Sequence, residues 1–117
     1  MSFHSFNNRL SQVNALIKKE LSNILLKELD LPSNVLITLT RVETLKNLSE
    51  AKIYVSVIPE EKREEVFKVI IGNIYNLQQH LNNRLKMRPV PKIRFEKENK
   101  TKEAAKIEEI LEQLKKS

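Results

Sequence analysis

The hydrophobic residues at the start of the chain follow a helical spacing. From Arg9 to Leu29 they recur at intervals of three and four residues, which places them on one stripe of a long amphipathic helix. We expect the helix to end near Asp30, because Pro32 disfavours helical geometry in the residue before it. The stripe consists of Leu10, Val13, Leu16, Ile17, Leu21, Ile24, Leu25 and Leu29.

Two runs rich in β-branched residues follow. Val35–Glu43 and Ala51–Ile58 are separated by a polar break at Lys46 and Asn47, so they predict two adjacent antiparallel strands. The second run alternates in character, which predicts one buried face and one face toward water. Its apolar face holds Ala51, Ile53, Val55 and Val57, and its other face holds Lys52, Tyr54 and Ser56.

A second long helical pattern begins after these strands. Pro59 and the two carboxylates after it suit the first turn of a helix. Apolar residues keep helical spacing from Phe67 to Leu85, and Pro89 is expected to end the helix at Arg88. Gly72, the only glycine of the chain, falls inside this pattern, where it marks either a bend or an ordinary tolerated glycine.

The last two elements are shorter. Val90–Lys97 predicts a third strand with Ile93 and Phe95 on its buried face. Thr101 can cap a final helix that extends to about residue 115. The expected order is therefore helix, strand, strand, kinked helix, strand, helix. We interpret residues 1–117 as a single α+β domain, with a core over about 7–98. The final helix has the stripe Ile107, Ile110, Leu111 and Leu114.

The net charge of +6 is concentrated in one segment. Between Arg84 and Lys106 the chain has nine basic and three acidic residues, whereas the remainder has 12 of each. This distribution favours a polyanion as partner, the alternative being that the lysines only keep the protein in solution.

The composition argues against several classes of function. The chain contains no cysteine, so disulfides and cysteine-ligated metal sites are excluded. No apolar run approaches the length that spans a bilayer, and we expect a cytoplasmic protein that does not contact membranes. His4 and His80 have no second histidine at ligand spacing, and no set of catalytic groups is apparent. We therefore expect no enzyme, no cofactor, no metal and no small-molecule substrate.

Two segments carry a resemblance to a known family. They are NLSEAKIYVSV over 47–57 and RLKMRPVPKIRF over 84–95, with weaker support from ITLTRVE over 37–43 and KIEEILEQL over 106–114. Across residues 9–114 the chain resembles the bacterial ribosome-binding factor A proteins. The resemblance implies a type II KH-like fold, in which a three-stranded sheet carries helices on one face, and a monomer that binds 16S rRNA and the small (30S) ribosomal subunit and assists its maturation and end processing.

The chain departs from the family's pattern at three places, the mildest of which is Glu98, where the family has an aspartate after the last strand. Where the family commonly has Asp-Pro-Arg, this chain has Asp30, Leu31 and Pro32, so no role is carried over to an arginine. The family's Ala-x-Gly kink has no clean counterpart, since Ile70–Gly72 supplies only the glycine. Counting back from Arg88 places Asn73–Tyr75 there instead. The kink is thus expected at Gly72 or near Asn73 and Tyr75.

One glycine cannot form the Gly-x-x-Gly loop with which ordinary KH domains hold single strands. RNA recognition is then expected to rest on cationic side chains and phosphate contacts. Arg84, Lys86 and Arg88, at the end of the long helix, are the first candidates. The same surface is expected to continue through Lys92, Arg94, Lys97, Lys100 and Lys102.

Other interpretations remain beside this one. Arg9, Lys18 and Lys19 join the cationic surface or simply face solvent. The chain as a whole is alternatively a protein-interaction module that docks through its last helix, or a generic basic nucleic-acid-binding domain without ribosome specificity. A DNA-binding regulator is less favoured, because no helix-turn-helix pattern is visible.

Overall fold

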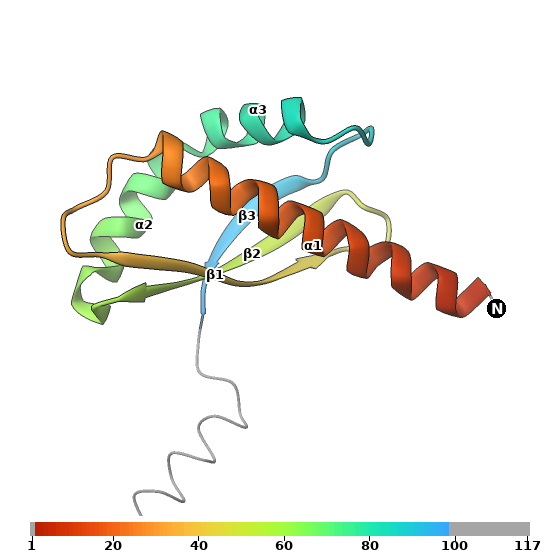
Figure 1. Ribbon diagram of the computed structural model, residues 1–117, viewed down its shortest axis with the longest axis horizontal. Coiled ribbons are helices and arrows are strands. Elements are labelled where there is room, and N and C mark those ends of the chain that lie inside the picture. The colour runs from red at the N-terminus through yellow and green to blue at the C-terminus, as the bar shows by residue number, and fades with distance from the viewer. Residues whose placement is uncertain (1, 99–117) are drawn as a thin grey trace, which may run out of the picture.

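The computed structural model describes residues 2–98, and within them it has the expected order of elements. The expected helix after Thr101 lies outside the described residues. The α+β class is confirmed, with three helices and a three-stranded sheet (Figure 1). The elements are α1 (Ser2–Glu28), β1 (Leu36–Thr44), β2 (Glu50–Ile58), a 3-10 turn (Glu60–Lys62), α2 (Arg63–Gly72), α3 (Ile74–Arg84) and β3 (Lys92–Lys97).

The sheet has the order β1-β2-β3. As predicted, β1 and β2 pair antiparallel, with Ile37 opposite Val57. β3 pairs parallel to β2, with Ile93 opposite Ala51. A parallel neighbour requires a long crossover connection, which α2 and α3 provide. The central strand is therefore paired along both edges.

The hydrophobic core lies between the sheet and the helices. The four inward residues of β2 are buried, and Ile53 and Val55 have no exposed surface. Ile17, Leu21 and Ile24 of α1 are equally buried, as the stripe predicted. Each such side chain contributes about 1.5–3 kcal/mol through burial. From α2 and α3 the core receives Val66, Phe67, Ile70, Leu77 and Leu81.

The long helix is interrupted at Asn73, so α2 and α3 run in different directions (Figure 1). The backbone of Asn73 is non-helical, with φ −111° and ψ 11°, and its side-chain amide donates to the carbonyl of Val69 at 2.8 Å. Gly72 is not in the left-handed region, and a Cβ there would meet no atom within 4 Å. Asn73 therefore marks the kink, and Gly72 closes the preceding helix without a steric need for glycine.

The expected end of this helix at Arg88 is wrong, because α3 ends at Arg84. Leu85 is extended, with φ −92° and ψ 137°, while its N–H still donates to Leu81 and its side chain is buried. Four more helical residues would carry the chain about 6 Å further along the helix axis. The early stop instead lets residues 85–91 turn back, so that Lys92 starts β3 beside Glu50.

The amide of Gln78 fastens α3 to the start of β3. Its oxygen accepts the N–H of Ile93 at 2.8 Å, and its nitrogen donates to the carbonyl of Pro91 at 3.1 Å. These two backbone groups lie at the edge of the sheet away from β2. Gln78 therefore provides hydrogen-bond partners for two backbone groups on the outer edge of β3, which no further strand covers within residues 2–98.

We predict that Gln78→Ala lowers the free energy of unfolding by about 1–2 kcal/mol, because two partly buried backbone groups lose their partner. Gln79→Ala, on the exposed side of the same turn, is the matched control and should stay within about 0.5 kcal/mol of the parent. Urea unfolding of both variants makes the comparison. Equal stabilities would show that Gln78 does not fasten the edge.

Candidate nucleic-acid interface

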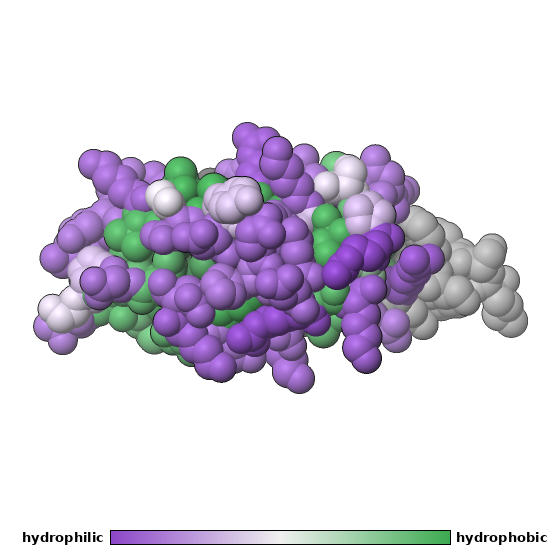
Figure 2. Space-filling view, turned by 90° about the horizontal axis from the view of Figure 1, so that it is seen from above, coloured by the Kyte–Doolittle hydropathy of each residue, from purple (hydrophilic) through white to green (hydrophobic). Residues whose placement is uncertain are grey.

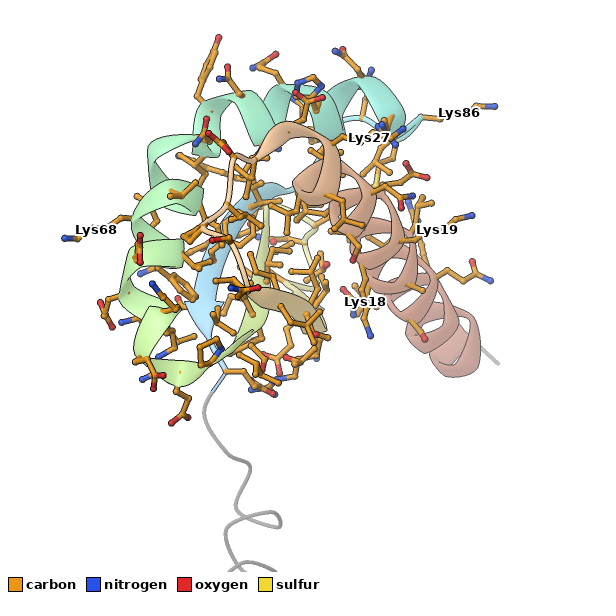
Figure 3. The ribbon with its side chains drawn as sticks, turned by 60° about the vertical axis from the view of Figure 1, so that its left-hand side comes forward. Lys18, Lys19, Lys27, Lys68 and Lys86 are labelled. Carbon is orange, nitrogen blue, oxygen red and sulfur yellow. The ribbon has the colours of Figure 1, made fainter. Side chains whose placement is uncertain are left out.

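Basic side chains of α1 and of the segment after α3 gather on one side of the molecule. Lys19, Lys27 and Lys86 project from this side, whereas Lys68 projects from the opposite side (Figure 3). Lys18 points toward the sheet instead, where its ammonium donates to the carbonyl of Thr40 in β1 at 3.5 Å. We call Lys19, Lys27 and Lys86 the helix-side lysines. The view over α3 and α1 is dominated by hydrophilic residues (Figure 2). Residues that are far apart in the sequence thus form one cationic surface.

The packing of α1 against α3 produces this arrangement. Glu20 of α1 accepts from the guanidinium of Arg84 at 3.1 Å, and Glu28 lies 3.4 Å from the imidazole of His80. These contacts bring the end of α3 alongside α1. The guanidinium of Arg84 also offsets the charge of Glu20, so this carboxylate does not cancel the charge of the neighbouring lysines.

Arg84 and Arg88, two of the three leading candidates, have structural partners. Arg84 is held by Glu20. One nitrogen of Arg88 donates to the carbonyls of Leu85 and Met87 at 2.8 and 2.7 Å. Arg88 thus stabilises the non-helical segment after α3. Lys86 differs, because its side chain is exposed and makes no ion pair within residues 2–98.

The open face of the sheet is balanced in charge. Arg94 contacts Glu96 at 3.3 Å and Glu50 at 3.7 Å. Arg41 contacts Glu43 at 2.7 Å and Glu98 at 3.4 Å, and its guanidinium lies 3.8 Å from the ring centroid of Tyr54. Four basic residues, Arg41, Lys52, Lys92 and Arg94, share this face with four acidic ones, Glu43, Glu50, Glu96 and Glu98. Their electric fields largely cancel, so a phosphate group gains little electrostatic attraction at this face.

Lys97 lies on neither surface, because it faces α2. Its ammonium pairs with the carboxylate of Glu64 and lies 5.6 Å from the ring centroid of Phe67. The hydrogen bond and the charge of Lys97 lower the pKa of Glu64 below its ordinary value. Lys97 is thus separated from the cations with which it was grouped, and Lys100 and Lys102 lie outside the described residues.

A small groove lies between α3 and the start of β3. Tyr75, 73% exposed, and Lys92 border it, and Ile74, Gln78 and Ile93 complete its lining. Its volume is about 200 Å³. No sequence pattern indicated that Tyr75 and Lys92 are neighbours, since 17 positions separate them. An aromatic ring beside an ammonium suits a base and its phosphate.

Lys27 is the residue that sequence reasoning missed. It lies eight positions after Lys19, which places its side chain about 80° around α1 from that of Lys19. Both positions fall outside the apolar stripe of this helix, and that is the signal the sequence offers. Which polar side of α1 meets the end of α3 was not readable, however, because it depends on the packing of the two helices.

Within residues 2–98, no group of three or more potential metal ligands comes together. No helix in that part of the chain is both long enough and apolar enough to cross a bilayer.

Comparison with known proteins identifies relatives of this chain. A sequence model of the family described as ribosome-binding factor A matches residues 9–111. A ribosome-binding factor A of Caldanaerobacter subterraneus subsp. tengcongensis is 35% identical over 102 residues, which are 86% of this chain and 84% of that protein. The match spans nearly all the described elements.

Two sets of coordinates for such a factor agree with this match. The crystal structure of ribosome-binding factor A from Thermus thermophilus has a TM-score of 0.63 at 23% identity, over 75% of this chain and 93% of that one, and confirms the KH-like fold. A homology model of the Thermus thermophilus factor, fitted into a cryo-EM map of a complex of the 30S subunit with that factor, has a TM-score of 0.62 at 26% identity, over 71% of this chain and 88% of that one.

We predict different effects of substituting two neighbouring cations. Arg88→Ala should lower the free energy of unfolding by about 1 kcal/mol, because two carbonyls lose a charged donor. Lys86→Ala should change it by less than about 0.5 kcal/mol. Urea unfolding measures both. If Arg88→Ala is neutral, its contacts with Leu85 and Met87 contribute nothing, and Arg88 becomes as suitable as Lys86 for probing RNA.

Proposed function

This chain belongs to the ribosome-binding factor A family, and on that premise we propose that it is a non-catalytic assembly factor that binds the free small ribosomal subunit through 16S rRNA. The observation that carries the proposal is the separation of charge between the two sides of the fold. Exposed lysines lie along α1 and after α3, while the open face of the sheet is neutralised by its own carboxylates.

The helix-side lysines suit the phosphate backbone of RNA. Lysine is a mobile point charge, so a row of lysines can follow phosphates without fixing one base sequence. Only four phenylalanines and two tyrosines occur in the chain, which disfavours a broad stacking platform. Recognition by shape and charge is therefore the better description, and affinity should fall steeply with salt.

The remaining candidates take secondary roles in this proposal. Tyr75 and Lys92 border the groove beside α3, where one unpaired nucleotide can stack and be neutralised. Arg84 and Arg88 position the surface through their contacts with Glu20 and with backbone carbonyls. Arg94 and Lys97 are already paired with carboxylates, and phosphate has to displace these partners to reach them.

Binding energy alone is the proposed mechanism. A protein that holds one arrangement of the subunit RNA more tightly than another shifts the population toward the first. In this way a monomer in the cytoplasm favours an immature subunit conformation in which the ends of 16S rRNA are accessible for processing, and it leaves when the particle matures. The 30S complex of the Thermus thermophilus relative supports the choice of partner.

We predict that replacing Lys19, Lys27 and Lys86 by glutamine abolishes most binding to free small subunits at moderate salt. Each lost phosphate contact should reduce the slope of log affinity against log salt concentration by about 0.7–0.9, so the triple variant should lose about 2–3. Sedimentation with purified small and large subunits at several salt concentrations measures both the slope and the preference.

The matched control replaces Arg41, Lys52 and Arg94 by glutamine, which removes the same charge from the open face of the sheet. This variant should retain most of its affinity and most of its salt slope. If it loses as much as the helix-side variant, net charge governs binding and the surface is misassigned. If the parent protein shows no preference for small subunits, the chain is a generic basic domain.

The role in maturation has its own test in cells. When the helix-side variant is the only copy present, precursor 16S rRNA with unprocessed ends should accumulate several-fold over cells with the parent protein. Mapping of the rRNA ends by primer extension measures this fraction. If the variant fails to bind subunits and the rRNA ends are nevertheless processed normally, subunit binding is not needed for maturation. That result would contradict the proposed role.

A further inference from the structure

An apolar groove runs along the outer side of α2, next to the end of β3. Its volume is about 400 Å³. Ile71 is 57% exposed there, and the space above Gly72 is open, since a Cβ at that position would meet nothing within 4 Å. Burying a half-exposed isoleucine beside an aromatic ring lowers the free energy, because apolar surface is removed from water. The full lining is Glu64, Phe67, Lys68, Ile71, Gly72 and Lys97.

The chain leaves the described part of the structure at the rim of this groove. Lys97 is itself part of the lining, held by Glu64 and placed near the ring of Phe67. The N–H of Glu98 donates to the carbonyl of Val55 at 2.9 Å, which fixes the direction of the backbone there. The segment that follows therefore starts beside the groove.

That segment has a complementary apolar stripe. Ile107, Ile110, Leu111 and Leu114 recur at helical spacing over eight residues, about 10 Å of helix. The groove spans Glu64 to Ile71, also eight residues of helix. A helix this short is marginal in water by itself and gains stability by packing its apolar face. Residues 99–106 can span up to about 26 Å, which is ample to seat the stripe.

We propose that residues 107–114 dock as a helix in the α2 groove, with their apolar stripe against Phe67 and Ile71. Charge supports this occupant. Lys68 borders the groove and makes no ion pair within residues 2–98, while Glu108 and Glu112 lie one turn apart beside the stripe. Lys68 projects opposite the helix-side lysines (Figure 3), so docking leaves the cationic surface free and does not rest on the proposed function.

The absence of cysteine permits a direct test in the full-length chain. Gln113→Cys, off the apolar stripe, carries a single nitroxide spin label. Paramagnetic broadening of backbone amide signals should be several-fold stronger for residues 67–72 than for residues 22–26 of α1. Adding Ile71→Ser should abolish this difference. Leu26→Ser is the matched control, because Leu26 is 78% exposed in a separate apolar groove, and it should leave the broadening unchanged.

Three outcomes would overturn the proposal. Equal broadening of the two regions would show that the segment does not select the α2 groove. Persistence of the pattern in Ile71→Ser would show that the apolar contact is not responsible. Broadening of an isotopically labelled chain by a separate spin-labelled chain would assign the groove to a second copy. Subunit binding by Ile71→Ser should match the parent, so failure here is distinguishable from failure of the RNA proposal.

Discussion

The central strand β2 is the constraint on which the fold depends. It is paired along both edges, and its inward side chains are buried. Because β3 must run parallel to it, the chain has to cross over the sheet between them, and the crossover must cover the apolar face. The interruption at Asn73 makes this possible, since a straight helix of more than 20 residues would extend beyond a sheet of strands six to nine residues long.

The helices cover only one face of the sheet, and this arrangement also determines which charged side chains pair with one another and which remain unpaired. On the open face, neighbouring strands bring basic and acidic side chains within reach of one another, as with Arg94 between Glu50 and Glu96. Cross-strand spacing is short enough that such pairs form wherever opposite charges face each other. On the helices the polar side chains point away from the core over a wider curved surface. The lysines of α1 therefore keep their charge available, although the whole chain carries only +6.

Most of the fold was predictable because it follows from local periodicity. The alternation in β2, the buried pair Ile93 and Phe95 and most of the stripe of α1 were readable from spacing and are buried as expected. Leu16 is the exception in that stripe, because its side chain is 43% exposed. The end of α3 at Arg84 was not readable, since it is set by where β3 must begin. The partners of Arg84, Lys97 and Arg41 were not readable either. Glu20, Glu64 and Glu98 lie 64, 33 and 57 positions away, and only the tertiary fold brings them together.

These pairings give most arginines a structural role and leave the helix-side lysines exposed. Arg41, Arg84, Arg88 and Arg94 are each engaged by carboxylates or carbonyls, where the planar fork of donors holds two elements or a loop in place. The exposed helix-side cations are lysines, whose mobile point charges suit the proposed contacts with phosphate. Such contacts give affinity that depends on RNA shape and ionic conditions more than on base identity. A surface of this kind suits the proposed function, in which the protein binds a folded RNA and releases it when the spacing of the phosphates changes.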